Sequence, residues 1–181
     1  GDFSRRAMIY RMNGDLANDL GNLSQRVLSM IFKNCSGVMP ALPATAAPED
    51  SALLDEADAM LGKVRAHMDV QSFHEALRCI WEVVSDANKY VDTTAPWGLK
   101  KTDPVRMGEV LAVLAETIRQ AAILVQPVMP GSASKILDQL GVADGQRGFD
   151  MLAGAGRIAA GVEISKPEHV FPRFVEEEGE V

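Results

Sequence analysis

The stretch QSFHEALRCIWEVVSDANKYVD, residues 71–92, indicates the fold most directly. Its apolar residues recur at steps of four and three, at Phe73, Leu77, Ile80, Val84, Ala87 and Val91. That period places them on one face of an α-helix, whereas a half-buried strand would alternate every second residue. The stretch therefore predicts a helix that packs one face into a core. Pro96 ends it, because the residue before a proline avoids helical geometry.

The same periodicity on either side predicts three more long helices, over residues 4–33, about 49–68 and about 104–127. Glu49 and Asp50 suit the first turn of the second of these. Asp103 suits the N-cap of the last, and Pro104 its first helical position. Residues 36–48, rich in Gly, Pro and Ala, form a loop. A short fifth helix is expected over about 131–140, ending at Gly141.

After Gly141 the helical pattern weakens, and glycines interrupt the chain. Apolar residues continue there without a helical period, which suggests extended pieces lying across the helices. We therefore expect an all-α fold: an antiparallel helix bundle with an irregular C-terminal strap. The boundary falls between a helical domain, residues 1–141, and a C-terminal extension, residues 142–181.

Composition is that of an ordinary globular protein, with 47% apolar and 24% charged residues. No apolar run of about 18 residues predicts a membrane span, and no signal peptide opens the sequence. Cys35 and Cys79 are too few for a disulfide framework. We expect both to be reduced and buried, with a cytoplasmic location. The sequence begins at Gly1 instead of an initiator methionine, so an excised domain, a processed product or an ordered piece of a longer chain is expected.

The sequence carries little that predicts chemistry. His67, His74 and His169 are too far apart for a zinc pattern or a nucleophile and base. Neither of the glycine-rich motifs that hold phosphates is present. We expect no catalytic residue, no metal ligand and no cofactor within these 181 residues. The net charge of −7 argues against DNA and requires any RNA contact to use a local site.

One polar row in the first helix is a candidate for such a site. Asn18, Asn22 and Arg26 are four residues apart, so they share a slanting row on the side away from the apolar stripe. Amides both donate and accept hydrogen bonds, and arginine adds a planar fork of donors, so together they can match base edges. Asparagine is a poor helix former, and its repetition suggests that the side chains are used. A solvated polar face is the simpler interpretation.

The second candidate is Trp97, which follows Pro96 and so hangs from a stiffened backbone. An exposed aromatic plane beside hydrogen-bonding groups suits the reading of unpaired bases. Supporting RNA contacts are expected from four polar residues nearby in sequence: Asn88, Lys89, Lys100 and Lys101. Alternatively, Trp97 caps the core and the lysines are merely solvated. Trp81 is expected in the core or at its edge.

Four stretches together resemble a known family: RMNGDLANDLGNLSQR (11–26), ANKYVD (87–92) followed by Ala95-Pro96-Trp97, AAILVQPVMP (121–130) and VFPRF (170–174). They are similar, in order and over nearly the whole chain, to the anticodon-binding domain of bacterial methionyl-tRNA synthetases, a class I family. The N-L-x-x-R helix is shared by several class I synthetases. The A-P-W element with its partner helix points to the methionine enzyme.

The resemblance implies recognition of the CAU anticodon loop of methionine tRNA. It implies that Trp97 stacks on the cytosine, that Asn22 and Arg26 hydrogen-bond to anticodon bases, and that Asn18 belongs to the same set. The family activates methionine with ATP and magnesium and transfers it to tRNA. Its catalytic half carries HIGH-like and KMSKS-like motifs, which are absent from this sequence.

The resemblance therefore implies a part of a methionine-tRNA ligase that is inactive on its own. It also implies that residues 142–181 pack on the catalytic half, and a monomer is favoured. Two alternatives remain open at this point. The chain is the anticodon-binding domain of a related class I synthetase, or it is a helical protein–protein interaction module in which Trp97 only plugs the core.

Overall fold

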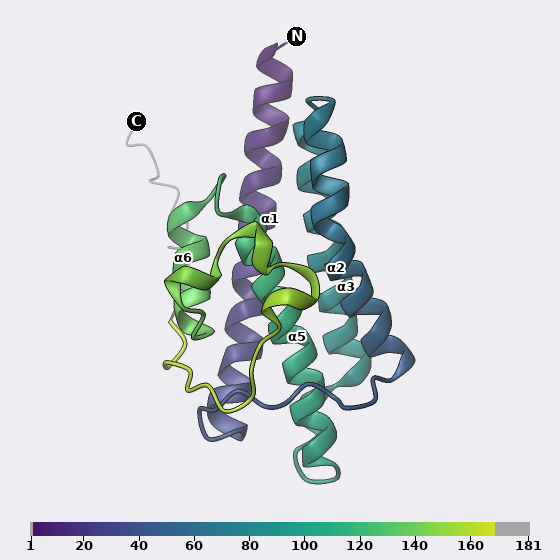
Figure 1. Cartoon of the computed structure of the whole chain (residues 1–181), viewed down its shortest axis with the longest axis vertical. Coiled ribbons are helices and arrows are strands. Elements are labelled where there is room, and N and C mark those ends of the chain that lie inside the picture. Colours follow the sequence, from purple (N-terminus) through teal and green to yellow (C-terminus); the bar gives the residue numbers. More distant parts are fainter. Residues whose placement is uncertain (1, 169–181) are drawn as a thin grey trace, which may run out of the picture.

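The chain folds into helices that run along one long axis (Figure 1). The structure is a computed structural model that describes residues 2–168. The long helices are α1 (Asp2–Asn34), α2 (Pro48–Asp69), α3 (Phe73–Thr94), α5 (Pro104–Val125) and the shorter α6 (Pro130–Gln139). A one-turn helix, α4 (Pro96–Leu99), and three 3-10 turns, η1 (Asp144–Gln146), η2 (Phe149–Met151) and η3 (Ala153–Gly156), complete the order. The predicted all-α bundle is confirmed.

The predicted helices each lie within a few residues of an observed one, and α4 is the α-helix that the sequence did not predict; η1, η2 and η3 stand where extended pieces were expected. Ala95 ends α3 with a φ of 44°, in the left-handed region, and so turns the chain sharply. Pro96 then starts a single turn, in which Gly98 N donates to Ala95 O at 2.9 Å. Trp97 therefore sits on a short, fixed turn and not on an open loop.

Helix α5 forms the centre of the bundle. Residues 110–125 are all buried, as are Met107 and Gly108. Helices α1, α2, α3 and α6 contact it from different sides. It begins as the sequence predicts: Pro104 is its first residue, and the Asp103 carboxylate accepts a hydrogen bond from Arg106 N at 3.1 Å. Among the described helices, none is long and apolar enough to cross a membrane.

The C-terminal strap, as far as residue 168, packs on the bundle itself. Val162 O accepts a hydrogen bond from Met39 N at 2.8 Å, and Ile164 N donates to Gly37 O at 2.9 Å. Leu152 and Ile164 are buried in the common core. The packing of residues 142–181 on a catalytic half stays a prediction. The VFPRF stretch, His169 and the acidic C-terminus lie outside the described residues.

The two cysteines are free, as expected, but the prediction that they are buried is wrong. Both are half-buried: Cys35 follows the end of α1, and Cys79 lies at the edge of the apolar face of α3. Partial burial still raises the pKa of both thiols. Trp81 lies at the core edge, as predicted, and its Nε1 donates to Asp19 Oδ2 at 2.6 Å.

An ion pair is buried inside α5. Arg119 is 2% exposed and donates from Nε to both oxygens of Glu116, at 2.7 and 3.0 Å. Its Nη1 donates to Met151 O at 2.7 Å and thereby holds the strap. Burial raises the pKa of the Glu116 carboxyl, although the guanidinium counteracts the shift. Each partner therefore makes the burial of the other tolerable.

We expect Arg119→Met to lower the free energy of unfolding by about 3 kcal/mol, because it removes the hydrogen-bonded partner of the buried Glu116 and leaves only Arg157, at 4.0 Å, as a counter-charge. The double variant Arg119→Met with Glu116→Gln should recover part of the loss. Urea unfolding followed by circular dichroism measures both. A single variant within about 1 kcal/mol of the parent would contradict the mutual dependence of the pair.

Candidate nucleic-acid interface

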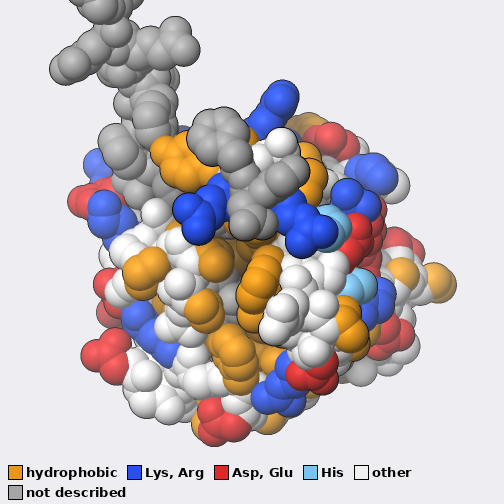
Figure 2. Space-filling model, turned by 90° about the horizontal axis from the view of Figure 1, so that it is seen from above, with side chains coloured by type: hydrophobic (Ala, Val, Ile, Leu, Met, Phe, Trp, Pro, Cys, Tyr) orange, Lys and Arg blue, Asp and Glu red, His pale blue; other side chains and the backbone are white. Residues whose placement is uncertain are grey.

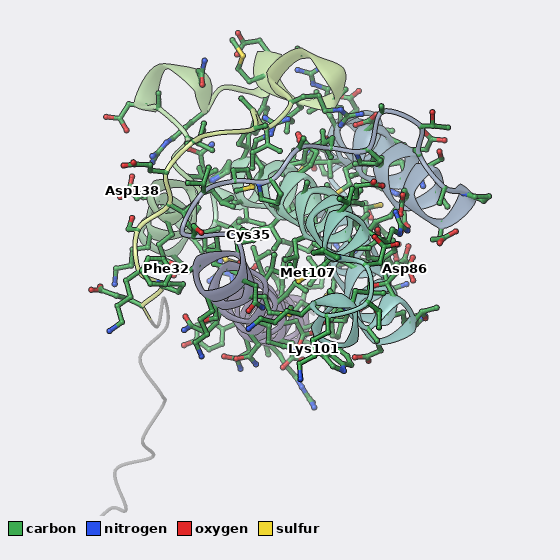
Figure 3. The ribbon with its side chains drawn as sticks, turned by 90° about the horizontal axis from the view of Figure 1, so that it is seen from below. Phe32, Cys35, Asp86, Lys101, Met107 and Asp138 are labelled. Carbon is green, nitrogen blue, oxygen red and sulfur yellow. The ribbon has the colours of Figure 1, made fainter. Side chains whose placement is uncertain are left out.

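The elements that carry the predicted site residues meet towards one end of the bundle, the lower end in Figure 1, although Asn18 lies near the middle of α1. The last turns of α1, the end of α3, the one-turn helix α4 and the start of α5 meet there. Figure 3 looks onto this end, with Phe32 and Cys35 at the end of α1 and Lys101 and Met107 around the start of α5. Segments far apart in sequence thus share one surface.

The polar row of α1 is exposed, as its position on the helix predicts. Asn18, Asn22 and Arg26 all face solvent. The opposite face of the same helix is in the core, and its buried residues include Leu16, Leu20, Leu23 and Val27. The row is therefore open to a ligand along about two and a half turns of the helix, while the buried face fixes its direction.

The structure brings Arg26 and Trp97 together. Arg26 Cζ lies 5.9 Å from the centre of the Trp97 ring, a distance at which a cation and an aromatic face attract each other. Arg26 Nη2 also lies 3.5 Å from Asp92 Oδ1 on α3. Trp97 is 53% exposed, which is not the burial of a core plug. A guanidinium and an exposed ring therefore form one composite surface.

The four supporting residues divide into two groups. Lys100 and Lys101 are exposed just after α4 and lie near Trp97 in sequence. Asn88, in contrast, is half-buried, and its Nδ2 donates to Val84 O of its own helix at 3.1 Å. Lys89 Nζ lies 3.4 Å from Asp86 Oδ1 and lines the groove between α2 and α3. The two lysines after α4 are thus the better placed for RNA.

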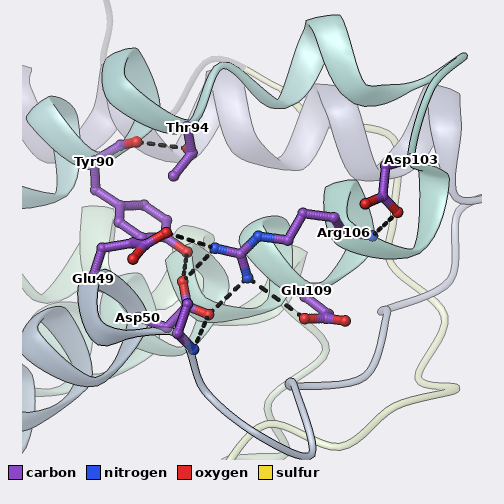
Figure 4. A network of polar contacts seen from close by, with 8 residues as sticks. Glu49, Asp50, Tyr90, Thr94, Asp103, Arg106 and Glu109 are labelled. Carbon is purple, nitrogen blue, oxygen red and sulfur yellow. Dashed lines mark hydrogen bonds and ion pairs between the residues drawn. The ribbon is translucent and has the colours of Figure 1, made fainter.

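A network of polar contacts supports the segment that carries Trp97 (Figure 4). Its centre is Asp50, which is 0% exposed. Tyr90 Oη donates to Asp50 Oδ1 at 2.6 Å, while Arg106 Nη1 donates to Oδ2 at 2.7 Å and Nη2 to Oδ1 at 2.9 Å. Ala47 N adds a fourth bond, to Oδ2, at 3.1 Å. Three helices, α2, α3 and α5, therefore meet at one carboxylate.

The electrostatics of this network keep Asp50 charged. Burial alone would raise the pKa of its carboxyl, but the hydrogen bonds from Arg106, Tyr90 and Ala47 outweigh burial and hold the pKa below its usual range. Burial and the neighbouring carboxylate raise the pKa of Tyr90, so its hydroxyl keeps its proton. Sequence reasoning missed this network, since it placed Asp50 only as an acidic residue of a first helical turn.

The opposite end of the bundle, onto which Figure 2 looks, has a different character. The start of α1 and the turn between α2 and α3 form a groove there that mixes basic and apolar side chains, including Arg5, Arg6, Ile9, Val70 and Phe73. The polar row and Trp97 do not belong to that groove. The chain therefore offers two distinct surfaces at its two ends.

Comparison with known proteins places the chain near one family. Residues 40–181 match the family model described as the anticodon binding domain of methionyl tRNA ligase. The methionine--tRNA ligase of Brucella suis biovar 1 (strain 1330) is 50% identical over 177 residues, which is 97% of this chain and 34% of that protein. The methionine--tRNA ligase of Mycobacterium tuberculosis (strain ATCC 25618 / H37Rv) is 48% identical over 179 residues, 96% of this chain and 34% of that protein.

Solved structures of methionyl-tRNA synthetases contain a region with the same fold. The free-state crystal structure of Mycobacterium tuberculosis methionyl-tRNA synthetase superimposes with a TM-score of 0.85 at 47% identity, covering 92% of this chain and 34% of that one. A structure of the same synthetase bound by methionyl-adenylate gives a TM-score of 0.84 and covers 92% of this chain and 33% of that one. The chain spans about a third of the length of these relatives.

The carboxyl group of Glu56, in the groove between α2 and α3, makes the stability of the fold depend on pH. Burial, a hydrogen bond with Asp86 and repulsion from it raise the pKa of Glu56 from 4.5 to about 7. The folded protein therefore binds this proton more tightly than the unfolded chain does. Stability from this group is present at low pH, and the free energy of unfolding falls as pH rises from about 4.5 to about 7.

We expect Glu56→Gln to remove this decline, because an amide does not ionise. The variant should melt at a higher temperature than the parent at pH 8 and lose that advantage at pH 4. Thermal melts across the pH range measure the difference, with Glu163→Gln as a control at an exposed carboxylate. Parallel curves for parent and Glu56→Gln would show that Glu56 has an ordinary pKa.

Proposed function

Because the chain belongs to the family of methionyl-tRNA ligase anticodon-binding domains, we propose that its α1–α4 surface reads the CAU anticodon of methionine tRNA. We define this surface by Asn18, Asn22, Arg26 and Trp97. The observation that carries the proposal is the placement of Arg26 over an exposed Trp97 ring, beside a row of exposed amides. Unpaired bases are recognised by aromatic rings that stack on them and by neighbouring polar groups that hydrogen-bond to their edges.

Each residue has a distinct role in the proposal. Trp97 stacks on the cytosine, which is worth about 1–3 kcal/mol for one base. Asn22 and Arg26 hydrogen-bond to the edges of anticodon bases, and Asn18 extends the row. Because Arg26 lies over one face of the indole, a base on the other face leaves the guanidinium in place to reach base edges. A wrong base leaves these polar groups unpaired, at a cost of about 1–3 kcal/mol each.

The acidic chain suits this mode of binding. Bases that are splayed out of a loop are read by stacking and edge contacts, so few phosphates need to be neutralised. Lys33, Lys100 and Lys101 are exposed at this end and can meet the few phosphates that are contacted, although the chain has a net charge of −7 and Arg26 is paired with Asp92. Asn88 and Lys89 would join them only after leaving Val84 and Asp86.

We propose that the domain serves a cytoplasmic ligase that activates methionine with ATP and magnesium and transfers it to tRNA. The residues of this chain select the tRNA, and a catalytic half of the same protein performs the reaction. Residues 142–181 would pack against that half, and the whole would act as a monomer. The relative solved with methionyl-adenylate is consistent with this division.

We expect Trp97→Ala to weaken binding of a CAU anticodon stem-loop by about 5- to 100-fold, the loss of one stacked base. Titration of labelled stem-loop at low salt measures it, with Val105→Ala as a control at an exposed apolar residue in the first turn of α5. In the complete ligase, kcat/KM for tRNA charging should fall by a similar factor.

Two results would contradict the proposal. One is a folded parent chain that does not bind the CAU stem-loop at low salt. The other is a Trp97→Ala variant that binds as tightly as the parent. A stem-loop with the cytosine replaced should also bind the parent more weakly than the CAU loop, because the new base still stacks on Trp97 but leaves edge-reading groups unpaired.

A further inference from the structure

We propose that Asp50, Tyr90 and Arg106 form a positioning cluster that fixes the orientation of Trp97 for base stacking. The inference rests on the proposed function, and it assigns a role in recognition to three residues that do not belong to the α1–α4 surface. They act through the chain segment that they hold, residues 95–103, which joins α3 to α5 and carries Trp97.

The cluster holds both ends of that segment. Tyr90 lies in the last two turns of α3, and Arg106 lies in the first turn of α5. Both bind the same carboxylate on α2, so Asp50 sets the distance between the two helix ends. Thr94 Oγ1 donates to Tyr90 O at 2.6 Å, and the Asp103 carboxylate caps α5 through Arg106 N. The segment therefore starts and ends on residues joined to the cluster (Figure 4).

Each oxygen of the Asp50 carboxylate accepts two hydrogen bonds. Oδ1 accepts from Tyr90 Oη and Arg106 Nη2, and Oδ2 accepts from Arg106 Nη1 and Ala47 N. All four partners are donors, and a carboxylate offers only acceptors, so every donor is satisfied. An amide in its place would turn an NH2 group towards a donor in either rotamer. Asp50→Asn therefore breaks the cluster with almost no change in volume.

The segment itself needs such support. Ala95 adopts a φ of 44°, and a non-glycine residue in the left-handed region costs about 1–2 kcal/mol. That conformation persists only where the surroundings impose it. Pro96 is buried and Leu99 packs on the core, so two apolar residues anchor the turn from within. Trp97 lies between them and is exposed, so its direction depends on a backbone held from both ends.

A second cluster in the chain provides a matched control. Asp58, also on α2, accepts from Arg157 Nη1 at 2.7 Å and Nη2 at 2.6 Å, and from Gln120 Nε2 of α5 at 2.8 Å. It resembles the Asp50 cluster in chemistry and in joining α2 to α5. It fastens the C-terminal strap, however, and not the segment of Trp97. Asp58→Asn should therefore loosen the fold without turning Trp97.

The fluorescence of Trp97 itself reports its orientation and mobility. The chain has two tryptophans, so Trp81→Phe in every sample leaves Trp97 as the only one. Asp50→Asn, Tyr90→Phe and Asp58→Asn are each compared with this parent. Circular dichroism and thermal melts report the fold, acrylamide quenching and emission anisotropy report Trp97, and titration with a CAU stem-loop reports binding. Trp97→Ala in otherwise native chain calibrates the loss of stacking.

We expect Asp50→Asn to keep its helix content, to change the quenching and lower the anisotropy of Trp97, and to bind the stem-loop about 5- to 10-fold more weakly, since only a fraction of molecules then hold Trp97 correctly. Tyr90→Phe should show the same changes at smaller amplitude. Asp58→Asn should lower the melting temperature and leave both Trp97 and binding unchanged. If Asp50→Asn does not fold, Tyr90→Phe decides the question.

The proposal is overturned if the folded Asp50 and Tyr90 variants match the parent in Trp97 signal and affinity. It is also overturned if Asp58→Asn changes both as strongly, because the effect is then a general loosening. Failure of the proposed function looks different: the parent does not bind the stem-loop, or Trp97→Ala binds as well as the parent, whatever the Trp97 signal does in the Asp50 variant.

Discussion

Burial of α5 on all sides is the constraint on which the rest of the structure depends. A helix buried around its whole circumference must be surrounded, so α1, α2, α3 and α6 pack about it. Its own polar residues then need partners inside the protein, because unpaired polar groups in a core are costly. Arg119 binds Glu116 and Met151 O, and Gln120 binds Asp58 and Ala153 N. Two of these partners, Met151 O and Ala153 N, belong to the irregular strap, so the polar residues of α5 hold the strap in place.

The sequence predicts the helices and the exposed row well, for a simple reason: both depend on one local period. The face of α1 that carries Leu16 and Leu20 is buried, so Asn18 and Asn22 must point outward. Burial of Glu116 could not be predicted in the same way, because its partners Arg119 and Arg157 shield a position that periodicity assigns to solvent. The same limit applied to Asp50, whose partners Tyr90 and Arg106 lie 40 and 56 residues further along the chain.

The candidate site combines a rigid ring with adaptable polar groups. Trp97 is carried on a one-turn helix between Ala95, in a left-handed conformation, and the capped start of α5. Arg26 is held by attraction to the ring and by Asp92 at 3.5 Å, both of them weak contacts at an exposed site. A fixed plane beside a guanidinium that can adjust suits recognition of bases that arrive unpaired. The acidic net charge discourages indiscriminate RNA binding, so selectivity rests on these short-range contacts.

The most direct test of the account is to map where RNA touches the chain. Amide chemical shifts of the isotope-labelled protein, recorded during titration with a CAU anticodon stem-loop, report each contacted residue. If the α1–α4 surface binds the anticodon, the changes cluster along residues 18–33 of α1 and along residues 95–101. Changes centred instead on the groove at the opposite end, around Arg5, Phe73 and His74, would contradict it.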